Sequence, residues 1–259
     1  MRSVRGRACL AIVLGTLCVF ALLPAGARAD TVHVLAAGAV QGGLRQIESA
    51  FKATTGHTID GSYDTVGALR DRVLAGDRAD VVFLSEAGMA ALHKAGKLAN
   101  DPPVIVGSIS VALAVRRGTP LPEAITTPDA LKRVLLAARS IAHADPARGA
   151  TAGVHFARVL EQLGIAEEVK PRLTVLSFGG DVIKGVAAGR FEIGASQSSE
   201  IKTHPGVTLL GSLPPPYALK TVYMAAKVAG AGPGADALLA FLGSPEAKAA
   251  FAGLGFDPP

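Results

Sequence analysis

Short runs of β-branched and other apolar residues alternate, from Thr31 onward, with segments whose apolar residues recur at helical spacing. This alternation is typical of strand–helix–strand units, which build mostly parallel sheets covered by helices. We therefore predict an α/β protein. The expected strands are 31–36, 57–63, 80–84, 109–115, 140–144, 173–178, 192–195, 207–210 and 221–227. The expected helices lie near 44–56, 66–74, 85–92, 128–138, 154–164, 181–188, 234–242 and 245–252.

The alternation runs twice along the chain, and Pro-rich stretches separate the two sets. Residues 118–127 are rich in Pro and Thr, and Pro214-Pro215-Pro216 forms a stiff connector. We expect two lobes joined by two crossings, the first made of 30–112 plus 217–259 and the second of 113–216. Each lobe would hold a mixed, mostly parallel sheet flanked by helices, with a ligand cleft between the lobes at the strand ends.

The first 29 residues have the order of a secretory signal. Arg2, Arg5 and Arg7 precede an apolar run over 8–23, and Ala27-Arg28-Ala29 supplies small residues two apart. The run is shorter than the roughly 20 residues of a membrane span. We predict cleavage after Ala29, and therefore a periplasmic protein that does not span the membrane once the signal is removed.

The charge and the cysteines narrow the class of function. The whole chain has a formal net charge of +5, and most of that excess comes from arginines in the leader. A nearly neutral mature chain gives no electrostatic argument for nucleic acid. Cys9 and Cys18 both lie in the leader, which excludes disulfides and thiol chemistry from the mature part. No two histidines have ligand spacing, so we expect no metal site and no cofactor.

Several predicted helices begin with small or hydroxyl residues directly after a strand. These starts are Gly38-Ala39, Thr65-Val66, 150–153 and 179–181. Unpaired N–H groups and the helix dipole make such starts suitable for anions. Ordinary turn chemistry explains the same residues. Arg148, in the loop before Thr151, either clamps a carboxylate with its planar fork or is a solvated loop residue.

Ordered segments across nearly the whole mature chain resemble the periplasmic molybdate-binding family. The matching segments are 34–39, 67–69, 79–85, 145–153, 189–194 and 244–247. The resemblance implies a type II periplasmic binding fold, a monomer, and a receptor that delivers a small anion to the membrane permease of an ABC importer. It implies a ligand site at Gly38, Ala39, Thr65, Val66, Arg148, Thr151, Gly153 and Gln197.

The family's ligand side chains are replaced in this chain. Ala39 and Val66 stand where the family has serines, although Thr65 offers a hydroxyl, and Gln197 stands where it has a tyrosine. These departures favour an anion other than molybdate. The expected ligand is a small anion, either an oxyanion such as molybdate or a small organic carboxylate.

A second resemblance supports an alternative function. Residues 197–202 and 205–214 look like a divergent branch that includes a periplasmic aconitate isomerase. Such an enzyme needs a general base near the substrate carbon. The candidates by location are His143, His155, Asp181 and Glu200, and a lone helical histidine such as His155 is more often structural. We expect the receptor first and the isomerase as the alternative. A sensor without an importer also fits the residues.

Overall fold

The structure is a computed structural model that describes residues 29–258. The predicted signal segment lies outside the described residues except for Ala29. Within the described part of the chain, no helix has the length and apolar character needed to cross a membrane.

One mixed sheet forms the centre of the molecule. Its order is β2-β1-β3-β9-β4-β7-β5-β6, with β8 also paired to β4. The β1, β2 and β3 strands are parallel to one another, as are β5, β6 and β7, whereas β9 and β4 run antiparallel to their neighbours. The predicted α/β class is confirmed. The strands are β1 (Thr31–Ala37), β2 (Thr58–Asp64), β3 (Val81–Ser85), β4 (Val104–Arg116), β5 (Ile141–Ala144), β6 (Leu173–Leu176), β7 (Ile193–Gln197), β8 (Val207–Ser212) and β9 (Lys220–Lys227).

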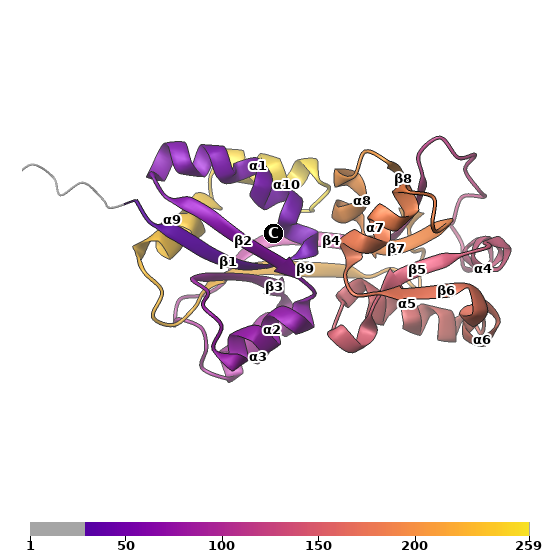
Figure 1. Cartoon of the computed structure of the whole chain (residues 1–259), viewed down its shortest axis with the longest axis horizontal. Coiled ribbons are helices and arrows are strands. Elements are labelled where there is room, and N and C mark those ends of the chain that lie inside the picture. Colours follow the sequence, from indigo (N-terminus) through magenta and orange to yellow (C-terminus); the bar gives the residue numbers. More distant parts are fainter. Residues whose placement is uncertain (1–28, 259) are drawn as a thin grey trace, which may run out of the picture.

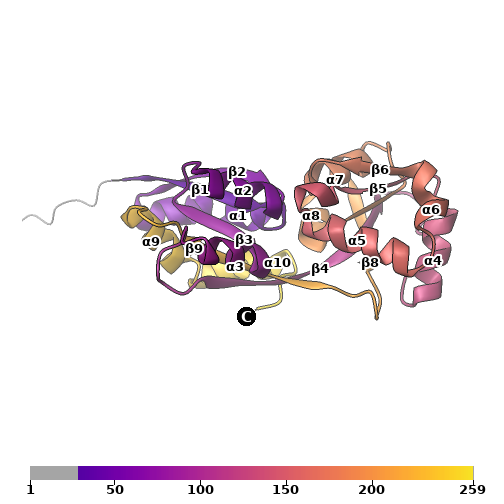
Figure 2. The same cartoon turned by 90° about the horizontal axis from the view of Figure 1, so that it is seen from below.

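The β4 strand belongs to both halves of this sheet. Its residues 104–110 pair with β9, and its residues 111–116 pair with β7 and β8. Figure 2 shows β4 running from one group of elements to the other. The return crossing lies beside it, because Val111 N donates to Leu219 O and Leu213 N donates to Val111 O. The two halves are therefore joined along a pair of adjacent segments.

Two large hydrophobic cores lie on either side of that junction. The first takes its buried residues from 32–109 and 223–256, and includes Phe51 and Phe83. The second takes its residues from 111–213, and includes Phe156 and Leu131. Two smaller clusters add to the second half. Figure 1 shows the corresponding two bodies, with α1, α2, α3, α9 and α10 around the first.

The helices form where apolar residues repeat every three or four positions. In α1, for example, Val40, Leu44, Ile47 and Phe51 are buried on one face, and Gly56 ends the helix in the left-handed region at φ 78°. The helices are α1 (Gly38–Thr55), α2 (Val66–Ala75), α3 (Glu86–Lys94), α4 (Pro128–Ala137), α5 (Thr151–Gln162), α6 (Ala166–Val169), α7 (Gly179–Ala187), α8 (Ser198–Thr203), α9 (Pro233–Phe241) and α10 (Pro245–Gly253), with short 3₁₀ turns at Pro146–Arg148 and Lys170–Arg172.

Several predicted boundaries are wrong around the second core. The α5 helix begins at Thr151 rather than 154, α7 begins at Gly179 rather than 181, and β6 ends at Leu176 rather than 178. Ala150 and Phe178 stand at the N-caps of these helices without a side-chain cap, so the usual Ser, Thr, Asp or Asn signal is missing. The α8 helix was not predicted, because six residues are too few for an apolar period.

Candidate functional site

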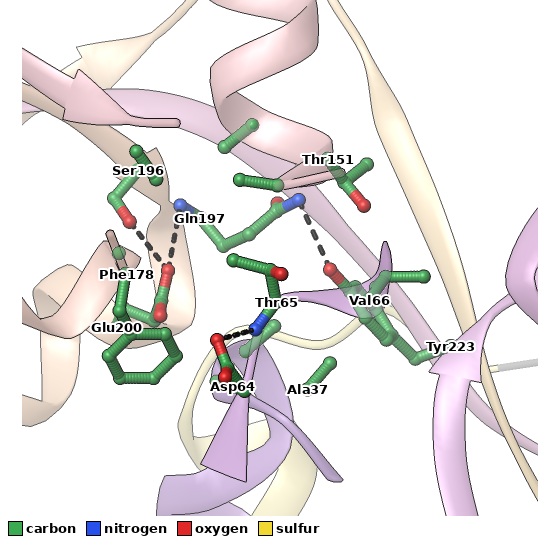
Figure 3. Close-up of a pocket in the computed structure, with 16 residues that line it drawn as sticks. Ala37, Asp64, Thr65, Val66, Thr151, Phe178, Ser196, Gln197, Glu200 and Tyr223 are labelled. Carbon is green, nitrogen blue, oxygen red and sulfur yellow. Dashed lines mark hydrogen bonds between the residues drawn. The ribbon is translucent and has the colours of Figure 1, made fainter. Parts of the chain in front are cut away.

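Helix starts from both halves of the molecule meet around one small cavity. Its volume is about 30 Å³. The N-cap residues of α1, α2, α5, α7 and α8 all line it, namely Ala37, Thr65, Ala150, Phe178 and Gln197. Ala37 and Gln197 end strands, Thr65 and Phe178 come within two residues of a strand end, and Ala150 follows β5 after the turn Pro146–Arg148, so the sheet places the helix starts together. Figure 3 shows the cavity with its labelled side chains pointing inward from several elements.

Three of these helices, α1, α5 and α7, begin at the cavity without a capping side chain. Within the described residues, Ala37, Ala150 and Phe178 make no side-chain cap for α1, α5 and α7. The first N–H groups of a helix have no partner inside the helix, and the dipole adds partial positive charge there. The cavity is therefore suited to an anionic group, as the sequence predicted for these turns.

A carboxyl group lies inside this electropositive setting. Glu200 is partly buried, and its Oε2 accepts a hydrogen bond from Ser196 Oγ at 2.5 Å and one from Gln197 N at 3.4 Å. A Cβ at Gly179 would lie 2.6 Å from Glu200 Oε2, and a Cβ at Gly38 would collide with Oε1. The carboxyl therefore lies between the starts of α1 and α7. Burial raises the pKa of Glu200, and the two hydrogen bonds oppose that rise only in part.

A buried polar pair forms another wall. Gln197 is 3% exposed and Tyr223 is 2% exposed. Gln197 Nε2 donates to Tyr223 Oη at 3.3 Å and to Thr221 Oγ1 at 3.4 Å, while Gln197 Oε1 has no hydrogen-bond partner in the described residues. Burial, with a further contribution from Glu200, raises the pKa of Tyr223 well above its usual value. Tyr223 is therefore a neutral phenol at physiological pH.

The halves touch at one edge of the cavity. Arg148 Nη2 donates to both carboxylate oxygens of Asp64, at 2.8 and 3.0 Å. Beside this pair, Thr65 Oγ1 donates to Arg148 O at 2.6 Å and Gly67 N donates to Gly149 O at 3.3 Å. A Cβ at Gly67 would lie 2.5 Å from Arg148 O, so the close approach requires glycine there. We call these contacts the latch.

The structure brings most of the predicted ligand residues to the cavity, but not all. The lining includes Gly38, Ala39, Thr65, Val66, Thr151, Gln197 and Glu200. Arg148 lies outside the lining and is engaged by Asp64, and the Thr65 hydroxyl is engaged by the Arg148 carbonyl. Gly153 packs instead against the backbone of Ala144, where a Cβ would collide with the carbonyl oxygen.

Three of the candidate bases also lie elsewhere. His155 Nε2 is hydrogen-bonded to Tyr217 O at 2.8 Å, and Asp181 pairs with Lys184 at 3.5 Å. His143 is buried, its Nδ1 lies 2.9 Å from Ala144 O, and burial lowers its pKa. None of the three lines the cavity. Glu200 is the candidate base that does.

The sequence-based site omitted Asp64, Phe178, Ser196 and Tyr223, which also line the cavity. Ser196 is the last residue but one of β7, and its place four residues before Glu200 is the signal that could have identified it. Tyr223 lies inside β9, and its approach depends on the antiparallel pairing of β9 with β3 and β4. Nothing in the local sequence marks that pairing. Across residues 29–258, no group of three or more His, Cys, Asp or Glu side chains is arranged to hold a metal ion.

The mixed sheet in two halves, with helix starts from both halves around one cavity, defines a two-lobed α/β binding fold. Residues 32–257 match the family described as bacterial extracellular solute-binding protein, and the chain belongs to this family. A curated relative named aconitate isomerase, from Pseudomonas sp., is 32% identical over 238 residues and covers 88% of each chain.

Solved structures share the fold at lower identity. The periplasmic molybdate-binding protein of Azotobacter vinelandii has a TM-score of 0.74 and 21% identity, covering 88% of this chain and 99% of that one. The sulfate-binding protein SubI of Mycobacterium tuberculosis has a TM-score of 0.68 and 22% identity, covering 88% of this chain and 87% of that one. At these identities the likeness concerns the fold, and it confirms the expected type of architecture.

Proposed function

We propose that this protein is an isomerase that binds a small polycarboxylate of the aconitate type in the cavity and moves a proton within it through Glu200. The observation that carries the proposal is the Glu200 carboxyl, enclosed among helix starts and held by Ser196. An ionised Glu200 facing the ligand would weaken simple capture of an anion, because two negative charges repel. A proton-transfer site needs such a group.

The chemistry is a 1,3-proton shift. Ionised Glu200 takes a proton from the CH₂ carbon next to the double bond, the C–H electron pair forms a new double bond, and the old double bond becomes a carbanion-like centre. The proton then returns to that centre, so the atoms balance and no co-reactant is needed. Negative charge spreads onto the conjugated carboxylate, where the N–H groups of α1, α5 and α7 stabilise it. The raised pKa of Glu200 makes its carboxylate a stronger base than an ordinary one, which favours removal of the carbon-bound proton.

The relative named aconitate isomerase supports the same substrate class, since it matches 88% of each chain at 32% identity. The cavity lies between the two cores, which supports closure of the lobes 30–112 plus 217–259 and 113–216 around the ligand. Ligand contacts would be made by Gly38, Ala39, Thr65, Val66, Thr151 and Gln197, with Arg148 and Gly153 acting from outside the lining.

The decisive experiment follows cis-aconitate by NMR in D₂O with wild-type protein and Glu200→Gln. We expect wild type to form trans-aconitate with deuterium incorporation, and Glu200→Gln to turn over at least about 100-fold more slowly. Ligand-induced thermal stabilisation should persist in Glu200→Gln, because the amide keeps the shape and removes a negative charge. The control is Glu192→Gln on the surface beside Arg139, which should match wild type. If Glu200→Gln turns over cis-aconitate as fast as wild type, Glu200 is not the base in the reaction.

A receptor for a small anion is the second candidate, and membership of the solute-binding family favours it. In that case the exported monomer would pass its ligand to the permease of an ABC importer. Tight binding of aconitate, molybdate or sulfate without turnover would establish this function instead. Either function requires export, so the N-terminal residue of the protein recovered from the periplasm should be Asp30, which N-terminal mass spectrometry reads directly.

A further inference from the structure

A larger groove opens beside the cavity. Its volume is about 810 Å³, and it shares with the cavity Gly38, Ala39, Phe178 and Glu200. The Phe178 ring packs against the Gly38 and Gly180 backbones, where a Cβ would lie 2.6 and 2.7 Å from ring carbons. Phe178 and the Glu200 carboxyl therefore form the wall between the two spaces, and a ligand that reached past them would touch both.

The groove gathers positive charge from three helices. Arg45 of α1, Lys184 of α7 and Lys202 of α8 all line it. Glu200 is the one acidic residue among the described residues of its lining. Lys184 has an acidic partner in Asp181 at 3.5 Å, whereas no ion pair within the described chain engages Arg45 or Lys202. The mature chain is nearly neutral, so this concentration of cations is local.

A buried tyrosine hydroxyl lies beside the same groove. Tyr63 lines it, its Oη is buried, and Oη has no hydrogen-bond partner in residues 29–258. The Arg45 guanidinium lies 5.9 Å from the centre of the Tyr63 ring. Burial raises the pKa of Tyr63, so its hydroxyl keeps its proton and can donate. The Tyr63 Oη lies against Gly61, where a Cβ would be 2.5 Å away, so it reaches a ligand in the groove only if its side chain shifts. The cations of Arg45, Lys184 and Lys202 are the groups that suit the groove to an oxygen-rich anion.

We propose that the groove is the second half of the ligand site and binds the remote carboxylates of a polycarboxylate. The cavity of about 30 Å³ has room for one small group, so the rest of a tricarboxylate must extend into the groove. Glu200 then faces the carbon skeleton between the bound carboxylates, where a proton is exchanged. This inference rests on the proposed function and adds the residues that select for the number of carboxylates.

The charges also link binding to closure. Arg45 is exposed on α1 in the first half of the molecule, and Lys184 and Lys202 lie on α7 and α8 in the second half. Closing the cleft brings these like charges toward one another, which costs free energy unless an anion lies between them. A polycarboxylate therefore stabilises the closed state more than a monocarboxylate does.

The test measures binding of propane-1,2,3-tricarboxylate, which has no double bond to move, by calorimetry. Wild type is compared with the triple variant Arg45→Gln, Lys184→Gln, Lys202→Gln, and with Lys94→Gln on α3 as a control of equal charge change per site. We expect the triple variant to bind the tricarboxylate at least about tenfold more weakly, and to bind acetate within about twofold of wild type. Lys94→Gln should bind both ligands as wild type does.

Equal affinity of wild type and the triple variant for the tricarboxylate would overturn the inference, and so would equal losses for the tricarboxylate and acetate. Turnover separates this inference from the proposed function. If the protein isomerises aconitate and the triple variant does so equally well, the proposed function stands and the proposed role of the groove is wrong. If tricarboxylate binding depends on the groove but the protein does not isomerise aconitate, the role of the groove stands and the proposed isomerase function is wrong.

Discussion

The Glu200 carboxyl makes the free energy of unfolding fall as pH rises, whereas most carboxylates make it fall as pH decreases. Burial raises its pKa above the ordinary value of 4.5, so the folded protein holds this proton more tightly than the unfolded chain does. The stability that Glu200 contributes is present below pH 4.5 and is lost as pH rises toward the raised pKa, with a slope of at most about 1.4 kcal/mol per pH unit. Urea unfolding at several pH values should show a shallower decline for Glu200→Gln.

Equal pH slopes for wild type and Glu200→Gln above pH 4.5 would contradict a raised pKa. Glu192→Gln serves as the control, because its carboxylate pairs with Arg139 at the surface and lies outside the cavity.

Gly38 is a residue whose missing side chain makes the site possible. A Cβ there would lie 2.6 Å from the Phe178 ring and would meet the Glu200 carboxyl. We expect Gly38→Ala to displace both groups and to weaken ligand binding about tenfold or more, since misplaced groups lose their contacts. Calorimetric titration with aconitate measures this loss.

The matched glycine control for that experiment is Gly253→Ala. A Cβ at Gly253 has no atom within 4 Å among the described residues, and the residue ends α10. The substitution should leave binding unchanged and stabilise the fold by up to about 1 kcal/mol. If Gly38→Ala also binds normally, the wall formed by Phe178 and Glu200 is not part of the site.

At the residue scale, the sequence predicted the backbone of the site better than its side chains. Gly38, Thr151 and Gly179 were named in advance because a turn of small residues between a strand and a helix can be recognised from the local sequence. Arg148 was expected either to clamp a ligand carboxylate or to be a solvated loop residue, and the structure pairs it instead with Asp64, 84 positions earlier. Partners so distant in sequence come together only when the halves are assembled, so no local pattern reveals them.

Among the elements, the turn Pro146–Arg148 and the start of α2 hold the latch between the halves. Loss of the Arg148 side chain removes both hydrogen bonds to Asp64 and one to Ser177 O. We expect Arg148→Ala to shift the ligand-free protein toward the open state and to weaken aconitate binding about three- to tenfold. Small-angle X-ray scattering without ligand should give a larger radius of gyration than for wild type.

Arg158→Ala is the control for the latch, because Arg158 is exposed on α5 and forms no ion pair within the described residues. Scattering curves and affinities that match wild type in both variants would show that the latch does not influence closure.

The helices around the cavity have starts that were hard to predict, because three of them lack a capping side chain. Many helix starts can be recognised in a sequence by a capping side chain. Thr127 caps α4 in this way, and Ser244 caps α10. The starts of α1, α5 and α7 lack one, and the sequence boundaries of α5 and α7 were wrong for that reason. A helix start without a capping side chain lacks the sequence signal by which such a start is recognised.

For the whole molecule, the two cores predict two units of local stability. Phe51 and Phe156 are fully buried, one in each core. Phe156→Ala should cost about 3–5 kcal/mol in the second half and leave amide protection around β1 and β3 nearly unchanged, while Phe51→Ala should do the reverse. Hydrogen exchange followed by mass spectrometry resolves the two patterns. Uniform loss of protection in both variants would indicate a single cooperative unit.

The overall alternation of strands and helices was enough to predict the α/β class and the bipartite pattern. It did not predict that β9 and β4 lie antiparallel in the centre of the sheet, because that pairing joins residues more than 100 positions apart. Nor did it predict that β4 begins at Val104, since residues 104–108 carry partly exposed side chains and a glycine. Their place in the strand comes from pairing with β9.

The shared strand limits how the protein can move. An extended segment resists stretching but twists readily, and β4 is a single strand that runs through both halves of the sheet beside the return segment. Two such ties, side by side, keep the halves at a fixed separation and leave rotation about their common line as the soft coordinate. We therefore expect the cleft to open as a torsion hinge, by rotation of one half about β4 and the return segment rather than by their separation.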